Sequence, residues 1–198
     1  VVKDAFVPES RLRPGFLEMP PPRPHLGAFY NGRLVSLLMS ELAAIAIGTA
    51  RAALDEYAEL MRTRRVTVPG LPLRSEWTEF QHHYGRASAL IETAESALME
   101  TARRYTEYAG QHRDGTGDFS QEKDMTLLIV EQQCADLAAE AVNLLFRTGG
   151  SSAAKRGERL ERYFRDISVI RTHMGEQYDR TWANYTRIVF GQQPIGVM

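Results

Sequence analysis

The sequence predicts an all-α protein, folded as an up-and-down four-helix bundle that follows a short extended N-terminal segment. Four long segments repeat their hydrophobic residues at intervals of three and four, as amphipathic helices do. Short stretches with glycine, proline and other turn residues separate them. The chain has 198 residues, 43% of them hydrophobic, which is enough for one well-buried domain. Long helices with short connections pack most simply side by side, and no repeat or low-complexity block indicates another architecture.

The first 28 residues lack a helical pattern. Residues 1–9 alternate loosely, as a strand does, until Pro8 interrupts them. Prolines at positions 14, 20, 21, 22 and 24 then exclude a continuous helix. We therefore expect a domain edge and a linker over residues 1–28, and the helical domain over residues 29–198.

The first helix is expected over residues 29–62, and its pattern is apolar on more than one face. Leucines and an isoleucine form one stripe, and small residues surround it: Leu34, Leu38, Leu42 and Ile45, with Ala43, Ala46, Ala50 and Ala53. Small side chains let helices approach closely, so this helix is predicted to be central to the bundle. Ser36, Ser40 and Glu41 interrupt the apolar run, which favours a buried helix over a membrane span.

The second helix is expected from residue 75 or 78 to about residue 111, with Thr78 and Gln81 as a capping box. Its buried stripe should consist of aromatic residues and alanines at steps of three and four. The neighbouring His82 and His83 cannot face the same way on a helix. We expect one solvated and one half-buried histidine there, and no shared metal site.

The third helix is expected to begin after Ser120 as its N-cap and to continue to Thr148. Cys134 falls on its core stripe, and we interpret it as a small core residue because apolar residues surround it and no histidine lies near it in sequence. Another face carries polar side chains, namely Gln133, Asp136, Glu140 and Asn143. No Glu-x-x-His motif accompanies these carboxylates, so no metal site is predicted.

The last helix is expected from Arg162 or Asp166 to Phe190. Aromatic and apolar residues recur along one of its sides, namely Tyr178, Trp182, Tyr185 and Val189. A tail with Gly191 and Pro194 ends it.

Charge and cysteine content narrow the classes of partner and compartment. The formal net charge of -1 gives no sign of nucleic acid or an anionic membrane as a partner. The single cysteine cannot form an internal disulfide, and no signal peptide precedes the first folded-looking segment, so we expect a cytoplasmic protein. Because the chain begins at Val1 without an initiator methionine, we interpret it as the later part, or a fragment, of a longer polypeptide.

One segment combines glycines, hydroxyls, arginines, a carboxylate and a histidine. It begins with Gly149, Gly150, Ser151 and Ser152, directly after the third helix. Paired glycines allow positive φ and expose backbone N–H groups, and the serines add further donors. Such a loop could hold a phosphate or a ring carbonyl. The alternative is an ordinary helix C-cap followed by a solvated turn.

The order of residues in this segment resembles a known family. Gly-Gly, a basic and polar spacer, then Arg162-Tyr163-Phe164-Arg165-Asp166 and finally His173 are similar to the C-terminal helical domain of the acyl-CoA dehydrogenase superfamily. Within it, the segment looks most like the oxygenase components of two-component flavin monooxygenases, such as 4-hydroxyphenylacetate and steroid-phenol hydroxylases and dibenzothiophene monooxygenase. The dehydrogenases proper carry Tyr-Glu-Gly-Thr here, with the glutamate as catalytic base. This chain has Arg171-Thr172-His173-Met174-Gly175 instead, which favours the monooxygenase branch.

The resemblance implies roles for particular residues. His173 would be catalytic, because an imidazole with a pKa near 6.5 can donate or accept a proton when reduced flavin reacts with oxygen. The loop of Gly149, Gly150, Ser151 and Ser152 would contact the flavin across a subunit boundary. Arg62 and Arg65 would reach its phosphates. Arg165 and Asp166 would form a structural ion pair, and residues 1–28 would include the last strand of a preceding β-domain.

The family likewise implies a reaction and partners. The chain would belong to an enzyme that takes reduced FMN or FAD from a separate flavin reductase and uses O2 to hydroxylate an aromatic or similar small molecule. It would assemble as a homotetramer, and the isolated segment would bind flavin weakly and turn nothing over. One alternative is an acyl-CoA dehydrogenase-like flavoprotein. Another is a non-catalytic helical oligomerisation domain. For His173 itself, the alternative to a catalytic role is a histidine on a helix face that bonds Glu176 or a carbonyl.

Overall fold

The regular elements of the residues that the structure describes are all helices, which confirms the predicted all-α class. The computed structural model describes residues 5–11, 18–66, 70, 72–173 and 178–195. These residues form five α-helices and three short 3-10 helices. Their only β-type pairing is an isolated bridge between Arg65 and Leu73.

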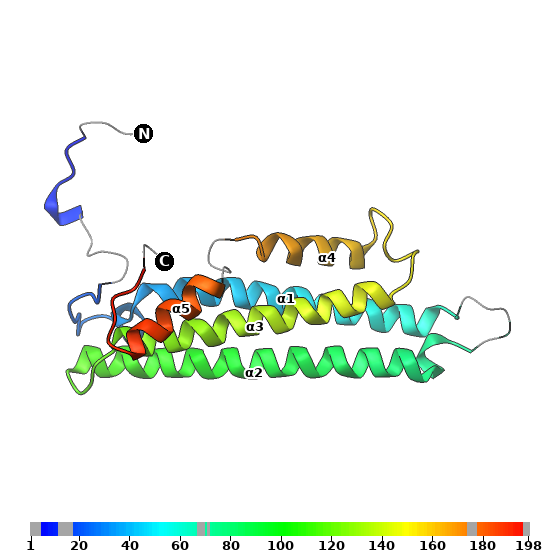
Figure 1. The fold of residues 1–198 in the computed structure, drawn as a ribbon, viewed down its shortest axis with the longest axis horizontal. Helices are drawn as coiled ribbons and strands as arrows, with labels where there is room; N and C mark the ends of the chain where they lie inside the picture. The colour runs from blue at the N-terminus through cyan, green and yellow to red at the C-terminus, as the bar shows by residue number, and fades with distance from the viewer. Residues whose placement is uncertain (1–4, 12–17, 67–69, 71, 174–177, 196–198) are drawn as a thin grey trace.

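Three long helices lie side by side and alternate in direction (Figure 1). They are α1 (Leu34–Thr63), α2 (Thr78–Asp114) and α3 (Gln121–Thr148). The shorter α4 (Arg159–Ile170) packs across α1 and α3, and α5 (Tyr178–Val189) packs on α3. The 3-10 helices are Glu9–Arg11, Ala28–Asn31 and Arg74–Glu76.

The expectation of one continuous last helix was wrong. The chain forms α4 and α5 instead, and α4 ends at Ile170. The backbone N–H of Thr172 donates to the Val169 carbonyl at 3.0 Å, and that of His173 donates to the Ile170 carbonyl at 3.0 Å. Bonds of this i to i−3 type tighten the end of a helix and stop it. His173 therefore lies in a turn and not on a helix face.

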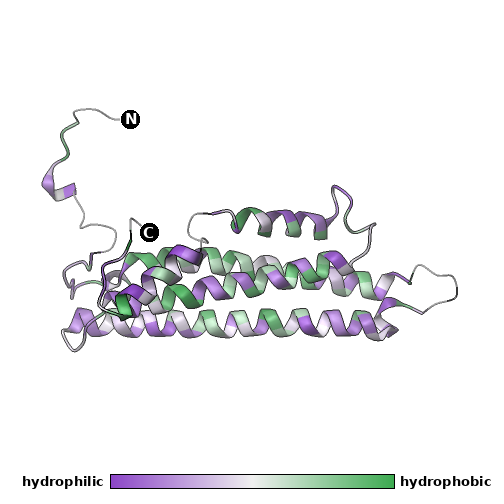
Figure 2. Ribbon diagram, in the orientation of Figure 1, coloured by the Kyte–Doolittle hydropathy of each residue, from purple (hydrophilic) through white to green (hydrophobic). Residues whose placement is uncertain are grey.

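The core of the bundle is built from small residues. Alanines of α1, α2 and α3 are fully buried where these helices meet, among them Ala46, Ala50, Ala87, Ala94 and Ala138. The predicted stripe of leucines and isoleucine on α1 does not face this core, since Leu38 and Ile45 are 36% and 55% exposed. Close helix approach selects the alanine face because only small side chains fit between the backbones. Figure 2 shows hydrophobic residues along most of α1, whereas hydrophobic and hydrophilic residues alternate along α2.

Of the two predicted helix N-caps, one forms and one does not. Ser120 caps α3 as predicted, because its Oγ accepts a hydrogen bond from the Lys123 N–H at 3.2 Å. The capping box at Thr78 and Gln81 does not form. Trp77 is the N-cap of α2, and the Gln81 side chain donates to the Ser75 carbonyl at 2.9 Å instead.

Two further expectations about side chains are confirmed. His82 is exposed and His83 is half-buried. Cys134 is buried in the main hydrophobic cluster, and burial raises the pKa of its thiol to about 11. A thiol that stays protonated inside the core is a packing residue and not a nucleophile.

By length and composition, α1 could cross a membrane. A single helix of this kind is weak evidence, because the core helix of a bundle has the same composition. Here α2, α3 and α4 all pack against α1.

The close packing of α1 at the alanine interface can be tested by substitution. Ala46→Leu inserts three carbon atoms where α1 meets its neighbours, and should destabilise the protein by about 2 kcal/mol through overpacking. Ala44→Leu, on the exposed side of the same helix, should change stability by less than about 0.5 kcal/mol. Urea unfolding monitored by circular dichroism measures both. Equal stability of the two variants would contradict the close packing of α1.

Candidate functional site

The loop that follows α3 depends on its two glycines for different reasons. Gly150 has a φ of +89°, a left-handed conformation that favours glycine. Gly149 has an ordinary helical φ of -67°. A Cβ on Gly149 would lie 2.6 Å from a methyl carbon of Leu160 and 3.1 Å from the Leu145 carbonyl oxygen. The first glycine therefore provides space, and the second allows the turn.

Two arginines that the sequence analysis did not select hold this loop in place. Arg74 is only 8% exposed, and its Nη1 donates to the Gly149 carbonyl at 2.7 Å. Arg64 donates from Nη1 to the Ser152 hydroxyl. The 149–152 loop is thus bonded at both ends by guanidinium groups.

The two arms of the connection between α1 and α2, residues 64–66 and 72–74, pair with each other and bring these arginines together. The Arg74 N–H donates to the Arg64 carbonyl at 3.0 Å, and Arg65 pairs with Leu73 in the isolated bridge. The Arg74 guanidinium stacks over the Phe80 ring, 5.0 Å from its centroid. Burial, and then the positive charge of Arg64, lower the pKa of Arg74. The end of the bundle beside the loop therefore carries concentrated positive charge.

The structure also locates the two arginines that the resemblance selected. Arg62 has 70% of its side chain exposed and forms an ion pair of 3.8 Å with Glu59. Arg65 is exposed in the connection that follows α1. Arg64 and Arg74 bond the loop, and the roles of Arg62 and Arg65 toward a flavin stay predictions. The turn residues between α1 and α2 could have pointed to Arg64 and Arg74 in the sequence. A chain that reverses direction there places Arg64 opposite Arg74.

His173 lies at the far end of α4 from the 149–152 loop, and its side chain is exposed in the single chain. The twelve residues of α4 separate the two, which corresponds to about 18 Å along the helix. One chain therefore does not bring His173 and the loop to the same place. The predicted alternative partner Glu176 lies outside the described residues.

The predicted ion pair between Arg165 and Asp166 does not form. Arg162 pairs with Asp166 at 3.4 Å, and Arg165 pairs with Glu161 at 3.9 Å. Both pairs have the i, i+4 spacing that places side chains on one face of a helix, whereas adjacent residues point apart. These partly exposed pairs support α4 and do not fix the loop.

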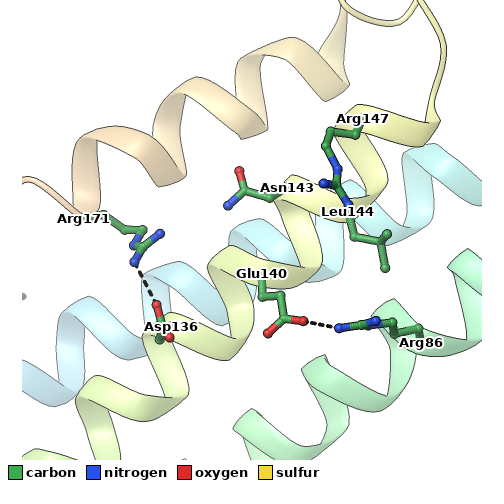
Figure 3. Close-up of a pocket in the computed structure, with 7 residues that line it drawn as sticks. All are labelled: Arg86, Asp136, Glu140, Asn143, Leu144, Arg147 and Arg171. Atoms are coloured by element: carbon green, nitrogen blue, oxygen red, sulfur yellow. Dashed lines mark hydrogen bonds and ion pairs between the residues drawn. The ribbon is translucent and has the colours of Figure 1, made fainter.

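The polar face of α3 lines a groove of about 340 Å³ (Figure 3). Asp136 accepts from Arg171 at 2.9 Å, and Glu140 accepts from Arg86 at 2.6 Å. The two carboxylates are thus neutralised by arginines from neighbouring elements. Within the described part of the chain, no three histidine, cysteine or acidic side chains come together as metal ligands.

A pair of buried acids lies nearer the start of α3. Asp124 accepts hydrogen bonds from the Ser36 hydroxyl at 2.6 Å and the Ser36 N–H at 3.3 Å. Glu131 is 3% exposed, and its Oε2 has no hydrogen-bond partner among the described residues. Burial, and then the charge of Asp124, raise the pKa of Glu131 to about 9. Sequence analysis missed Glu131, whose position on the core face of α3 was the available signal.

Comparison with known proteins assigns the fold and its glycine loop to a family. The profile described as "Acyl-CoA dehydrogenase, C-terminal domain" matches residues 40–178, a range that includes Gly149, Ser152 and His173. The chain belongs to this family. The resemblance seen in the sequence is thereby confirmed.

The relatives of this acyl-CoA dehydrogenase C-terminal domain include hydroxylases and monooxygenases. Over 176 residues it is 28% identical to the "Pigment production hydroxylase" of a Rhodococcus species, a match that covers 87% of this chain and 44% of that protein. It is 26% identical over 169 residues to the "Indole-3-acetate monooxygenase" of Pseudomonas putida, which covers 84% of this chain and 41% of that one.

A solved structure has the same fold over the whole chain. XiaF from a Streptomyces species, in complex with FADH2 and glycerol, superimposes with a TM-score of 0.83 and 20% identity, covering 100% of this chain and 50% of XiaF. The acyl-CoA dehydrogenase C-terminal domain described here therefore spans about half of the length of the proteins it matches.

The Arg74 contact can be tested by substitution. Arg74→Met removes a charged donor from the buried Gly149 carbonyl and should lower the free energy of unfolding by about 2 kcal/mol. Arg62→Met removes only an exposed pair with Glu59 and should cost less than about 0.5 kcal/mol. Urea unfolding of the two variants provides the comparison. An Arg74→Met protein as stable as Arg62→Met would show that the loop does not depend on this bond.

The buried acid predicts a pH dependence of stability. Because the pKa of Glu131 is raised to about 9 in the folded state, from an ordinary value near 4.3, the folded state binds more protons than the unfolded state between these values. The free energy of unfolding should therefore fall as pH rises from 5 to 9, by up to about 1 kcal/mol per pH unit. Glu131→Gln should flatten this slope, and the exposed control Glu122→Gln should keep it. Urea unfolding at pH 5.5, 7 and 8.5 measures the slopes, and identical slopes in wild type and Glu131→Gln would refute the assignment.

Proposed function

We propose that this chain is the C-terminal part of a flavin-dependent monooxygenase, which uses reduced FMN or FAD and O2 to hydroxylate an aromatic or similar small molecule. The observation that carries the proposal is the 149–152 loop, a glycine turn bonded by Arg64 and Arg74. Positive charge, with no carboxylate of the described residues bonded to the loop, suits a phosphate of a flavin nucleotide. The two relatives, a hydroxylase and a monooxygenase, support the same class of reaction.

The loop residues have the properties that a phosphate contact needs. A Cβ on Gly150 would lie 3.0 Å from Arg74 Nη2, so the absence of a side chain leaves the guanidinium close to the backbone. Ser151 is exposed and Ser152 is half-buried. We assign Gly149, Gly150, Ser151 and Ser152 to the flavin. Arg62 and Arg65 would contribute charge from the neighbouring end of α1.

His173 would move the proton of the reaction. When bound, reduced flavin supplies two electrons, so that one oxygen atom of O2 enters the substrate and the other leaves as water. The imidazole can accept the proton of a substrate hydroxyl or donate one to an oxygen, because its ordinary pKa lies near neutrality. Since α4 separates His173 from the loop of the same chain, the loop would serve the flavin of a neighbouring subunit.

The proposal includes the domain organisation, the assembly and the partners of the whole protein. Residues 1–28 would be the end of a β-domain and a linker, and residues 29–198 the helical domain. The protein would form a cytoplasmic homotetramer and receive reduced flavin from a separate reductase. Neither nucleic acid nor a membrane would be a partner.

Two other functions make different predictions. An acyl-CoA dehydrogenase-like enzyme would hold oxidised FAD, which an acyl-CoA thioester would bleach without oxygen; the absence of Tyr-Glu-Gly-Thr counts against it. The exposure of His173 in the single chain is the observation that favours a helical oligomerisation domain without a catalytic site. Such a domain would bind no flavin and consume no oxygen.

The test uses the full-length protein with a flavin reductase and a phenolic substrate. His173→Ala should lower the hydroxylated product formed per O2 consumed by at least about a hundredfold, with the oxygen released as hydrogen peroxide. Binding of reduced flavin, measured anaerobically by fluorescence, should not change. Thr172→Ala, the exposed neighbour, should retain wild-type coupling. Full coupling in His173→Ala would exclude the assigned role, and bleaching by an acyl-CoA thioester would establish the dehydrogenase.

A further inference from the structure

A small cavity opens between α1, α2 and α3 where α1 begins and α2 ends. Its volume is about 120 Å³, and its lining includes Phe29, Leu37, Ser40, Tyr105, Thr106 and Glu131. The 149–152 loop lies at the opposite end of the bundle, where α3 stops (Figure 1). The cavity is therefore separate from the residues assigned to the flavin.

Glu131 is the feature of this cavity that points to a ligand. The residue is only 3% exposed, and its Oε2 has no hydrogen-bond partner among the described residues. Buried polar groups in native proteins almost always have a partner, because an unmade bond leaves the full cost of desolvation. The neighbouring acid Asp124 has such partners in Ser36, whereas Glu131 faces the cavity.

The other hydroxyl groups at the cavity already donate hydrogen bonds to backbone carbonyls. The Ser40 hydroxyl donates to the Leu37 carbonyl at 2.7 Å, and the Thr106 hydroxyl donates to the Ala102 carbonyl at 2.9 Å. The Tyr105 hydroxyl donates to the Arg33 carbonyl at 3.0 Å. Glu131 is thus the group with a proton still to donate.

The walls of the cavity are largely apolar and suit the carbon skeleton of a ligand. The rings of Phe29 and Tyr105 lie 6.0 Å apart, and Leu37 adds an aliphatic side. The titratable groups that interact with Glu131 are Asp124 and Cys134 on α3 and Tyr105 on α2. Arg33, before α1, acts on Asp124. With a pKa of about 9, Glu131 is a neutral acid at pH 7. It presents one donor and one acceptor to an otherwise apolar space.

We propose that this cavity binds a small neutral molecule that combines a ring or short carbon skeleton with one hydroxyl group, such as a phenol. The hydroxyl oxygen would accept the proton of the Glu131 carboxyl group, and the hydroxyl hydrogen would bond its carbonyl oxygen. The carbon skeleton would lie between Phe29 and Tyr105. This binding requires neither flavin nor a second subunit, so it goes beyond the proposed function.

The size of the cavity limits the ligand. An apolar protein cavity of about 150 Å³ holds one benzene molecule. This cavity is somewhat smaller and open at one side, so a single six-membered ring reaching the surface at the exposed Ala102 is the upper limit. Phenol and benzene, which differ only in the hydroxyl group, are therefore the matched probes.

The experiment measures the affinity of the flavin-free, full-length protein for phenol and for benzene at pH 7 by NMR titration. Wild type should bind phenol about tenfold more tightly than benzene, the worth of one hydrogen bond to the buried acid. Glu131→Leu should abolish this preference, and the exposed control Glu122→Gln should retain it.

A second variant covers the case in which Glu131→Leu does not fold. Ala102→Phe places a ring at the cavity and should abolish binding of both probes while Glu131 is intact. Equal affinities for phenol and benzene in wild type would overturn the proposal, as would a phenol preference that survives Glu131→Leu. Unchanged phenol binding in Ala102→Phe would place the molecule elsewhere, for example in the proposed active site. Tighter binding of propylammonium than of phenol would show a cation site instead.

Discussion

The hydrogen bond from the buried Arg74 guanidinium to the Gly149 carbonyl is the contact on which the candidate site depends. It joins the connection between α1 and α2 to the loop after α3, across 75 residues of sequence. The last carbonyls of a helix need donors from outside it, and a charged donor in a buried place makes the strongest kind of bond. Gly150 completes the arrangement, because it lets the backbone turn with no side chain against the guanidinium. Ser151 is thereby presented outward on a fixed backbone.

The position of that bond follows in turn from the packing of small residues. Alanines let α1, α2 and α3 approach closely in the middle of the bundle, and the three helices pack against one another so that α1 ends beside the end of α3 (Figure 1). The same interface turns Leu38 and Ile45 outward and leaves α4 to lie across α1 and α3. With α4 in this position, the 149–152 loop and His173 are held at its two ends. One chain alone therefore does not bring the two together, which is why the proposed function places the loop at the flavin of a neighbouring subunit.

Charge divides the bundle into two chemically different ends. Arg64 and Arg74 meet where α3 stops, whereas Asp124 and Glu131 are buried nearer its start. The 18 residues from Glu131 to Gly149 span about 27 Å of helix, so the acids do not neutralise the arginines. One end suits an anion, and the other suits a neutral molecule that bonds a protonated carboxyl group.

The sequence by itself determined the features that depend on neighbours along the chain. Hydrophobic periodicity predicted the long helices, and Ser120 marked the start of α3. The glycine and arginine motif indicated the family. Tertiary structure decided the rest: that Arg64 and Arg74 hold the loop, that the last helix is divided, and that Glu131 is buried with one carboxyl oxygen unbonded by any described residue. The physical reason is that periodicity shows which residues share one face of one helix. Which faces meet, and which side chains bond over 75 or 88 residues of sequence, depends on the packing of whole helices.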